Sequence, residues 1–300
     1  MTQQVASGQE QTPISGANTR RWVTAQRHEV VAGAVAGISN QVVCHPFDTV
    51  RTRLQMTSAL AGPLHCAKGM LRHEGPLAFY KGLSAPLCAQ AVYKSVIFST
   101  NALVLRVIAP DASAERPPSS SKVWLGGVVS GAVNSLVVTP VELVRNQLMM
   151  QVHDRRFAGP KSLLTHLWRT SSSSSHFVSR LYRGWPLALA RDCSGVGLWL
   201  WGYHAARFAQ QGDSGRKLEL AELMAAGSFA GIMFWSVALP WDGLKTRTQC
   251  QPIDEPSHPW RELVRGFRPY RGYQVAFGRG IPGAAITLVT HHKILEALNG

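Results

Sequence analysis

A threefold internal repeat constrains this chain more than any other feature of its sequence. A G-x-x-x-G pattern occurs three times, and each time a proline follows 13 residues after its first glycine. These prolines are Pro46, Pro140 and Pro240, which are 94 and then 100 residues apart. An acid and, three positions later, a base follow each proline: Asp48 and Arg51, Glu142 and Arg145, and Asp242 and Lys245. Three matches in register predict three copies of one structural unit.

A second landmark recurs downstream in each copy, a tyrosine followed by a base and a glycine. It reads Tyr80-Lys81-Gly82, Tyr182-Arg183-Gly184 and Tyr270-Arg271-Gly272. In each copy this landmark begins another apolar segment of helical length, at residues 82–105, 184–208 and 272–294. We therefore expect six helices in three tandem repeats. Their predicted bounds are residues 28–110, 122–210 and 217–300, after a polar N-terminal tail at residues 1–27.

Long stretches without charge lead up to the prolines. Residues 30–47, 123–141 and 223–241 contain no Asp, Glu, Lys or Arg, and their length is close to the roughly 20 residues that span a bilayer core. Gly, Ser and Asn interrupt the apolar residues, which suits helices that face one another or a wet cavity. Proline kinks would bring three such helices together at their C-terminal ends. The predicted fold class is an all-α membrane protein.

Charge and composition narrow the range of partners. A net charge of +14 suits nucleic acid, anionic lipid headgroups, or an anionic solute drawn into a cavity. The bases lie mainly in loops and at helix ends, so we expect no nucleic-acid partner. The five cysteines form no C-x-x-C pair and the eleven histidines have no ligand spacing, so we expect neither a disulfide framework nor a metal site. We also expect no cofactor and no catalytic residue.

The acid and base after each proline share one helix face. They would be costly inside a membrane unless they were paired. Three symmetric helices would place them in a ring, for which we expect the cyclic order Arg51 with Glu142, Arg145 with Asp242, and Lys245 with Asp48. The alternative is a set of intrahelical pairs. Because desolvation offsets most of the attraction in a buried ion pair, such a ring suits a gate that opens when a solute favours the open state.

The segments Pro46–Arg51, Pro140–Arg145 and Pro240–Lys245 resemble the mitochondrial carrier family, and the resemblance covers residues 28–295. It implies a barrel of six transmembrane helices with threefold pseudosymmetry in the mitochondrial inner membrane. Both termini would lie in the intermembrane space, and transport would occur by alternating access. The ring would be the matrix gate, and a glutamine four residues beyond the base would brace a pair. Gln55 and Gln249 match that position, whereas the second repeat has Met149 there.

The family's second gate lies on the even-numbered helices and consists of an aromatic residue, an acid and a base. Here Tyr203, His204 and Arg207 keep the aromatic residue and the base but replace the acid with histidine. The second helix has Asn101-Ala102 and the sixth has His291-His292. We therefore expect a weak cytoplasmic gate and a resting protein that favours the state closed to the matrix.

Candidate solute contacts follow when the even-numbered helices are aligned on Gly82, Gly184 and Gly272. Positions seven, eight, eleven and twelve residues further on lie on or near one helix face, at the midplane depth of transporter sites. They are Ala89, Gln90, Tyr93, Lys94, Arg191, Asp192 and Arg279. Arginine offers a fork to a carboxylate and aspartate offers a partner to an ammonium group, so Arg191 beside Asp192 favours a solute with both signs of charge. The alternatives are a self-satisfied Arg191–Asp192 pair and a Lys94 that reaches to water.

An Arg–Asp pair at these positions resembles carriers of carnitine, acylcarnitines and basic amino acids. We expect a monomeric carrier for a small amphoteric metabolite of this kind, in which Tyr93 could stack on a quaternary ammonium group. The alternatives are a carrier of another anionic metabolite such as a carboxylate, a nucleic-acid-binding protein, and a membrane adaptor that does not transport. The resemblance also predicts lipid contacts, with cardiolipin at the helix N-termini near Gly82, Gly184 and Gly272.

Overall fold

The computed structural model describes residues 16–56, 62–110, 118–151, 156–211, 218–256 and 260–299. These residues contain α-helices and one short 3-10 helix, with no β-strand among them. The long helices are α1 (Gly16–Met56), α3 (Ser84–Ile108), α4 (Ser120–Met149), α7 (Trp185–Gln211), α8 (Leu220–Gln249) and α11 (Gly280–Asn299). The prediction of an all-α chain with three helix–loop–helix repeats is confirmed.

Short helices join the long ones within each repeat. They are α2 (Pro63–His73) and η1 (Pro76–Tyr80) in the first repeat, α5 (Pro160–Arg169) and α6 (Ser174–Leu181) in the second, and α9 (Trp260–Val264) and α10 (Tyr273–Gly278) in the third. The second long segment of the third repeat is split at Arg279, between α10 and α11. Glycines at 278 and 280 and Pro282 disfavour a continuous helix there. Helix α1 begins at Gly16, so part of the predicted polar tail is helical, while residues 1–15 lie outside the described residues.

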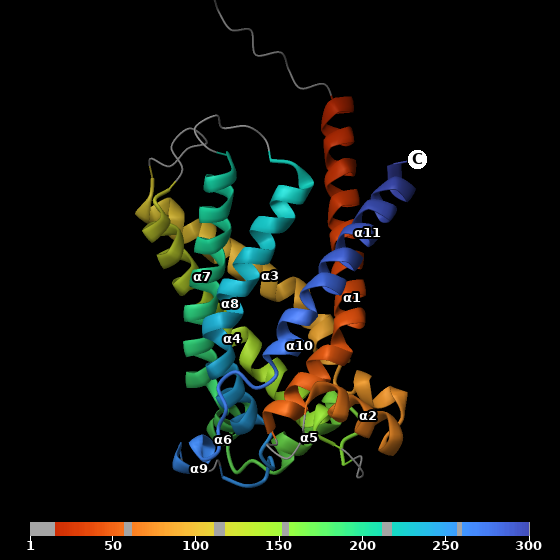
Figure 1. Cartoon of the computed structure of the whole chain (residues 1–300), viewed down its shortest axis with the longest axis vertical. Helices are drawn as coiled ribbons and strands as arrows, with labels where there is room; N and C mark the ends of the chain where they lie inside the picture. The colour runs from red at the N-terminus through yellow and green to blue at the C-terminus, as the bar shows by residue number, and fades with distance from the viewer. Residues whose placement is uncertain are drawn as a thin grey trace, which may run out of the picture.

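The two ends of the molecule differ. In Figure 1 the start of α1 and the C-terminus lie at one end, and α2, α5, α6 and α9 lie at the other. Helices α1, α4 and α8 all run towards the end with the short helices. Pro46, Pro140 and Pro240 lie inside these three helices. The acid–base motifs therefore lie at the end with the short helices.

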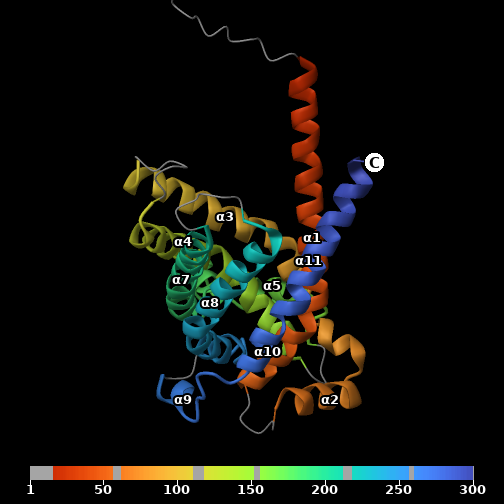
Figure 2. The same cartoon turned by 45° about the horizontal axis from the view of Figure 1, so that its top comes forward.

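Some pairs of neighbouring long helices around the barrel pack much more closely than others. Extensive contacts join α3 with α4, α4 with α7, α7 with α8, and α1 with α11. The α1–α3 and α8–α11 contacts are much smaller, and Figure 2 shows α1 and α11 leaning away from the other helices at their outer ends. The threefold arrangement is therefore tight at the end with the short helices and splayed at the opposite end.

Hydropathy alone reveals only part of this arrangement. Helices α4 and α8 are long and apolar enough to cross a membrane, and the bent pair Pro76–Leu87 and Val92–Ile108 would make a third span. Helix α7 carries Arg191 and Asp192 in its interior, both buried, and α1 carries Asp48 and Arg51. Charges that face a protein interior lower the mean hydropathy of a helix without preventing it from spanning a membrane.

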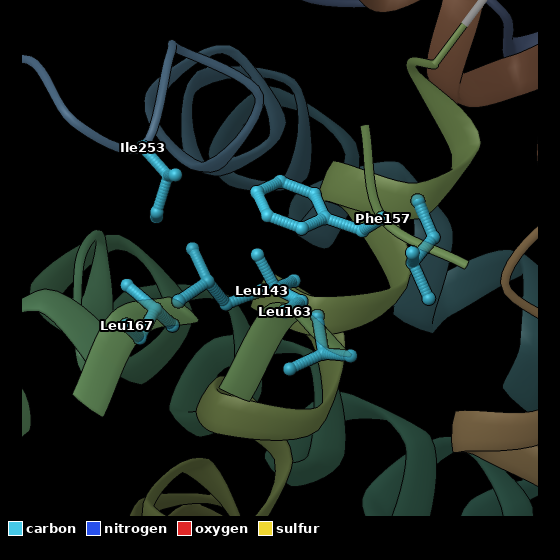
Figure 3. Packing of buried hydrophobic residues seen from close by; sticks show 7 residues of the cluster. Leu143, Phe157, Leu163, Leu167 and Ile253 are labelled. Atoms are coloured by element: carbon cyan, nitrogen blue, oxygen red, sulfur yellow. The ribbon is translucent and has the colours of Figure 1, made fainter. Parts of the chain in front are cut away.

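An apolar core anchors the short helices to the ends of the long ones. Leu143 of α4, Leu163 and Leu167 of α5, Phe157 before α5 and Ile253 after α8 pack together with Val144 and Leu148 (Figure 3). Leu143, Leu163 and Leu167 are completely buried. A second cluster does the same in the first repeat, where Leu54 of α1 packs with Met70 of α2 and Val275 of α10. These clusters fix the ends of α1 and α4, where the charged motifs lie.

Candidate functional site: a central cavity above a ring of ion pairs

A cavity of about 360 Å³ lies among the long helices and is closed on one side by the charged motifs. Helices α1, α3, α4, α7 and α8 line it, together with Arg279. Its walls include Tyr93, Lys94, Asn134, Glu142, Arg191, Asp192, Trp199, Phe234 and Trp235. Aliphatic and aromatic side chains with a few convergent charged groups are typical of a small-molecule site.

The motif acids and bases form a ring of three ion pairs between repeats. Arg145 Nη2 lies 2.9 Å from Asp48 Oδ2, Lys245 Nζ lies 2.6 Å from Glu142 Oε2, and Arg51 Nη2 lies 3.4 Å from Asp242 Oδ2. Asp48, Asp242 and Lys245 are each at most 2% exposed. Each of the three helices α1, α4 and α8 is thus joined to the other two.

The cyclic order of the ring is opposite to the one predicted from the sequence. Each base pairs with the acid of the preceding repeat, and Arg51 of the first repeat closes the circle with Asp242 of the third. Three residues turn a helix by about 300°, so the acid and base of one helix face different neighbours. Which neighbour each one faces depends on the direction in which the repeats surround the axis, and the motif spacing does not specify that direction. One intrahelical contact adds to the ring, between Lys245 and Asp242 at 3.4 Å.

The two candidate glutamine braces behave differently. Gln55 Nε2 donates to Asp242 Oδ2 at 3.1 Å and so supports the pair that Asp242 forms with Arg51. Gln249 does not brace an ion pair, contrary to the expectation. Its carboxamide donates to the carbonyls of Thr139 and Arg183, and accepts from Asn146 Nδ2 at 2.9 Å. These partners already satisfy the Gln249 side chain at the end of α8.

The predicted solute-binding arginines are bound to the acids of the ring. Arg191 contacts Glu142 at 2.9 Å, Asp242 at 3.2 Å and its neighbour Asp192 at 2.7 Å. Arg279 pairs with Asp48, which also holds Arg145. Sequence reasoning placed both arginines on the cavity wall but missed that they reach the ring. In this closed arrangement the cavity wall and the gate share the same carboxylates.

The remaining predicted contacts lie on α3 and α7. Ala89 is buried, Tyr93 and Lys94 line the cavity, and Gln90 lies on α3 with its side chain outside the described residues. Asp192 accepts a hydrogen bond from Asn134 Nδ2 at 3.1 Å. Sequence reasoning missed Asn134, Trp199 and Trp235. Asn134 precedes Pro140 by six residues, as Asn40 precedes Pro46 and Phe234 precedes Pro240, so aligning the repeats at that position would have found it.

At the outer end the structure gives no ion pair to Tyr203, His204 or Arg207 among the residues that it describes. The Arg207 guanidinium lies 5.7 Å from the Tyr203 ring on the same helix. His204 Nδ1 is buried without a hydrogen-bond partner. The side chains of His291 and His292 lie outside the described residues. The expected weakness of an outer gate remains a prediction.

The tyrosine of the second landmark has a structural role that the sequence did not reveal. A proline within a helix frees the carbonyl four residues before it. Tyr182 donates to the carbonyl of Leu136, four residues before Pro140, at 2.9 Å. Tyr270 donates to the carbonyl of Ser236, four residues before Pro240, at 3.1 Å. Each hydroxyl satisfies the group that the kink exposes, as a buried or membrane-embedded backbone requires.

The base and glycine of the landmark tie each repeat to the next one. Lys81 donates to the carbonyl of Gln151, Arg183 to that of Pro252, and Arg271 to that of Leu54. The glycines have φ near +80°, a backbone conformation that favours glycine. A Cβ on Gly82 would lie 2.9 Å from the carbonyl oxygen of Arg145. Glycine is therefore needed at this position for the start of α3 to approach the ring.

Two carboxylates outside the membrane-spanning helices hold the short helices in place. Burial opposes the charge of Glu74, but hydrogen bonds from Arg53 and Lys81 outweigh it and lower the pKa of Glu74. Asp254 contacts His166, Arg156 and Arg180. Burial opposes its charge as well, and the bonds from His166 and Arg156 lower its pKa. Both carboxylates therefore stay ionised near neutral pH. Asp254 links the third repeat to the second, whereas Glu74 joins the end of α2 to Arg53 and Lys81 within the first repeat.

Known proteins match the chain over nearly its whole length. The family described as mitochondrial carrier protein matches residues 25–111, 116–213 and 216–300. Human solute carrier family 25 member 45 is 30% identical, over 89% of this chain and 98% of the relative. The mitochondrial arginine transporter BAC2 of Arabidopsis thaliana is 33% identical, over 75% of this chain and 74% of the relative. The mitochondrial basic amino acids transporter of Bos taurus is 27% identical, over 91% and 92%. With three matched repeats and a central cavity above a ring of ion pairs, the chain belongs to the mitochondrial carrier family and is a multi-pass solute carrier of the inner membrane.

Proposed function

We propose that this carrier moves a small amphoteric metabolite, one that has both a carboxylate and a cationic group. The observation that carries the proposal is the buried Arg191–Asp192 pair on the cavity wall, with the two side chains 2.7 Å apart. A solute with both charges can replace each partner of this pair with one of its own groups. The names of two relatives, an arginine transporter and a basic amino acids transporter, support basic amino acids as the first candidates.

Arg191 also gives a route from binding to opening. Its guanidinium holds Glu142 and Asp242, which are two of the three acids of the ring. A solute carboxylate that takes over Arg191 would weaken both contacts. The solute would thereby favour the open state by its differential affinity alone. Since buried ion pairs are only marginally favourable, a modest affinity difference is enough.

Carnitine and acylcarnitines remain second candidates. They also carry one carboxylate and one cation, and Tyr93, Trp199 and Trp235 in the cavity wall offer aromatic faces to a quaternary ammonium group. Trp199 and Trp235 already face protein cations, Lys94 at 5.0 Å and Arg51 at 4.5 Å. A quaternary ammonium group would have to displace one of them, so basic amino acids are the better fit.

Lipid contacts and oligomeric state belong to the same proposal. A groove of about 520 Å³ lies beside Gly82, between the start of α3 and the start of α5 at Gly159 and Pro160. Two helix N-termini directed at one groove favour a phosphate group, in line with cardiolipin binding near Gly82. We extend the same role to Gly184 and Gly272. A single chain encloses the cavity, so the carrier would act as a monomer, a transporter without catalytic activity.

Uptake into proteoliposomes tests the substrate class. We expect labelled arginine, lysine, ornithine or carnitine to enter, and Arg191→Ala to abolish that uptake. Arg106→Ala is the matched control, because Arg106 is exposed near the end of α3, outside the cavity lining. Thermal unfolding in detergent would confirm that each variant folds. Uptake of a dicarboxylate alone would favour the carboxylate alternative, and full uptake by a folded Arg191→Ala variant would refute the role of Arg191.

A further inference from the structure

Lys94 stands apart from the other cations of the cavity. It lies on α3 and is exposed, with its ammonium 5.0 Å from the centre of the Trp199 ring on α7. Phe98, one helical turn further along α3, packs against the same ring at 6.0 Å. No carboxylate forms a salt bridge with Lys94 among the residues that the structure describes. Trp199 thus holds Lys94 at the cavity wall without neutralising it.

The cavity lining contains more positive than negative charges. The cavity lining contains the bases Arg51, Lys94, Arg145, Arg191 and Arg279 and the acids Asp48, Glu142 and Asp192. Lys245 and Asp242 of the ring add one charge of each sign. The net charge is therefore +2. Every base except Lys94 forms a salt bridge with an acid. A net charge inside a membrane protein is costly and favours an ion of opposite sign.

Unsatisfied polar atoms point the same way. Among the cavity-lining residues, the Tyr93 hydroxyl, Arg51 Nε and Nη1, and Arg145 Nε are buried donors without a hydrogen-bond partner. The buried acceptor without a partner there is Asn134 Oδ1. Buried polar groups are normally satisfied, so each orphan marks a group that a ligand can complete. Because most of these unpaired atoms are donors, they favour a solute with acceptor oxygens. The one unpaired acceptor, Asn134 Oδ1, favours a solute that also carries a donor group.

We propose that Lys94, with the hydroxyl of Tyr93 beside it, receives the carboxylate of the solute and makes that carboxylate obligatory. Arg191 is held by three acids in this closed state, so Lys94 meets the carboxylate first, and Arg191 becomes available as the ring opens. Asn134 Oδ1, whose amide is anchored on Asp192, takes the cationic group of the solute. This assignment rests on the proposed function and names the part of the solute that determines specificity.

The consequence is discrimination between an amino acid and its decarboxylated amine. Arginine and agmatine, or lysine and cadaverine, share the cationic group and differ in the carboxylate. A hydrogen bond to a charged group contributes enough to change affinity about tenfold or more. The carrier should therefore take up arginine and lysine at least about tenfold better than agmatine and cadaverine.

The test measures uptake of both members of each pair by proteoliposomes with four proteins. The wild type and Lys94→Arg should prefer the amino acid. Lys94→Gln should raise the KM for the amino acid about tenfold and lower the ratio of amino acid to amine by a similar factor. Lys122→Gln is the control, since Lys122 is exposed at the start of α4 and outside the cavity lining. An unchanged ratio in a folded Lys94→Gln variant would overturn the assignment.

The two proposals fail in different ways. If the wild type moves none of the amphoteric solutes but moves a dicarboxylate, the proposed function is wrong. The role of Lys94 then stands only if Lys94→Gln raises the KM for that dicarboxylate, and falls if it does not. If the wild type moves arginine and agmatine equally well, the carboxylate is not obligatory and the role of Lys94 is wrong, while the carrier remains one for basic solutes.

Discussion

At the scale of single residues, the same motif has different uses in different repeats. The G-x-x-x-G pattern, which permits close helix packing, occurs in all three copies. Only the second copy packs this way: a Cβ on Gly127 would lie 2.7 Å from the Cα of Gly197, whereas a Cβ on Gly33 or Gly227 would meet nothing within 4 Å. The motif shows that helices can approach closely, but the partner must also be there, and α8 and α11 splay apart at this end.

This difference predicts opposite outcomes for two equivalent substitutions. Gly127→Ala should destabilise the protein by about 1–3 kcal/mol, because its methyl group would overlap the backbone of α7. Gly227→Ala should leave stability unchanged or raise it by up to about 1 kcal/mol, because a helical alanine restricts the unfolded chain. Thermal unfolding of the two variants in detergent gives the comparison. Equal losses in both would show that α8 is packed as closely as α4.

At the scale of helices, the prolines and tyrosines act together. The sequence predicted kinks at Pro140 and Pro240, and separately a tyrosine landmark that begins the next helix. Their connection is a hydrogen bond between residues 46 or 34 positions apart in the chain, and no local pattern could reveal it. The first repeat departs from this rule: Tyr80 stacks beside His45, with ring centroids 6.4 Å apart, and the structure describes no bond from its hydroxyl to the kink.

Removing the three hydroxyls tests this pairing. Tyr182→Phe and Tyr270→Phe should each lower the free energy of unfolding by about 1 kcal/mol, because each leaves a carbonyl at a kink without its donor. Tyr80→Phe should have no measurable effect, although it is the same chemical change at the equivalent position. The measurement is thermal unfolding in the same detergent. A loss at Tyr80 as large as at Tyr182 and Tyr270 would contradict the assignment.

At the scale of the whole molecule, the sequence predicted which residues form the ring but not how they are connected. Asp48, Glu142 and Asp242 converge because the repeats are equivalent, and equivalence can be read from one chain. The direction of pairing depends on how the repeats are arranged around the axis, so the predicted order was reversed. Arg191 and Arg279 reach the ring because α7 and α10 cross close to the kinked helices, which is a tertiary effect that the spacing of the motifs does not encode.

The ring of ion pairs holds the helices together in the closed state. The acids of the ring also bind Arg191 and Arg279 of the cavity wall. The four acids and five bases form two groups: Asp48 holds Arg145 and Arg279, while Arg191 joins Glu142, Asp242 and Asp192 to one another and so to Lys245 and Arg51. A solute that competes for Arg191 therefore acts on the gate directly. No ion pair among Tyr203, His204 and Arg207 is described at the opposite end, so we expect the resting carrier to remain closed at the ring.

A double-mutant cycle for Arg145 tests the ring most directly. Arg145→Gln and Asp48→Asn should be non-additive in thermal unfolding, with a coupling of about 1 kcal/mol or more, because the two groups are in contact. Arg145→Gln and Asp242→Asn, which belong to different pairs, should be close to additive. If Arg145 instead couples to Asp242 and not to Asp48, or to neither, the ring described here is wrong.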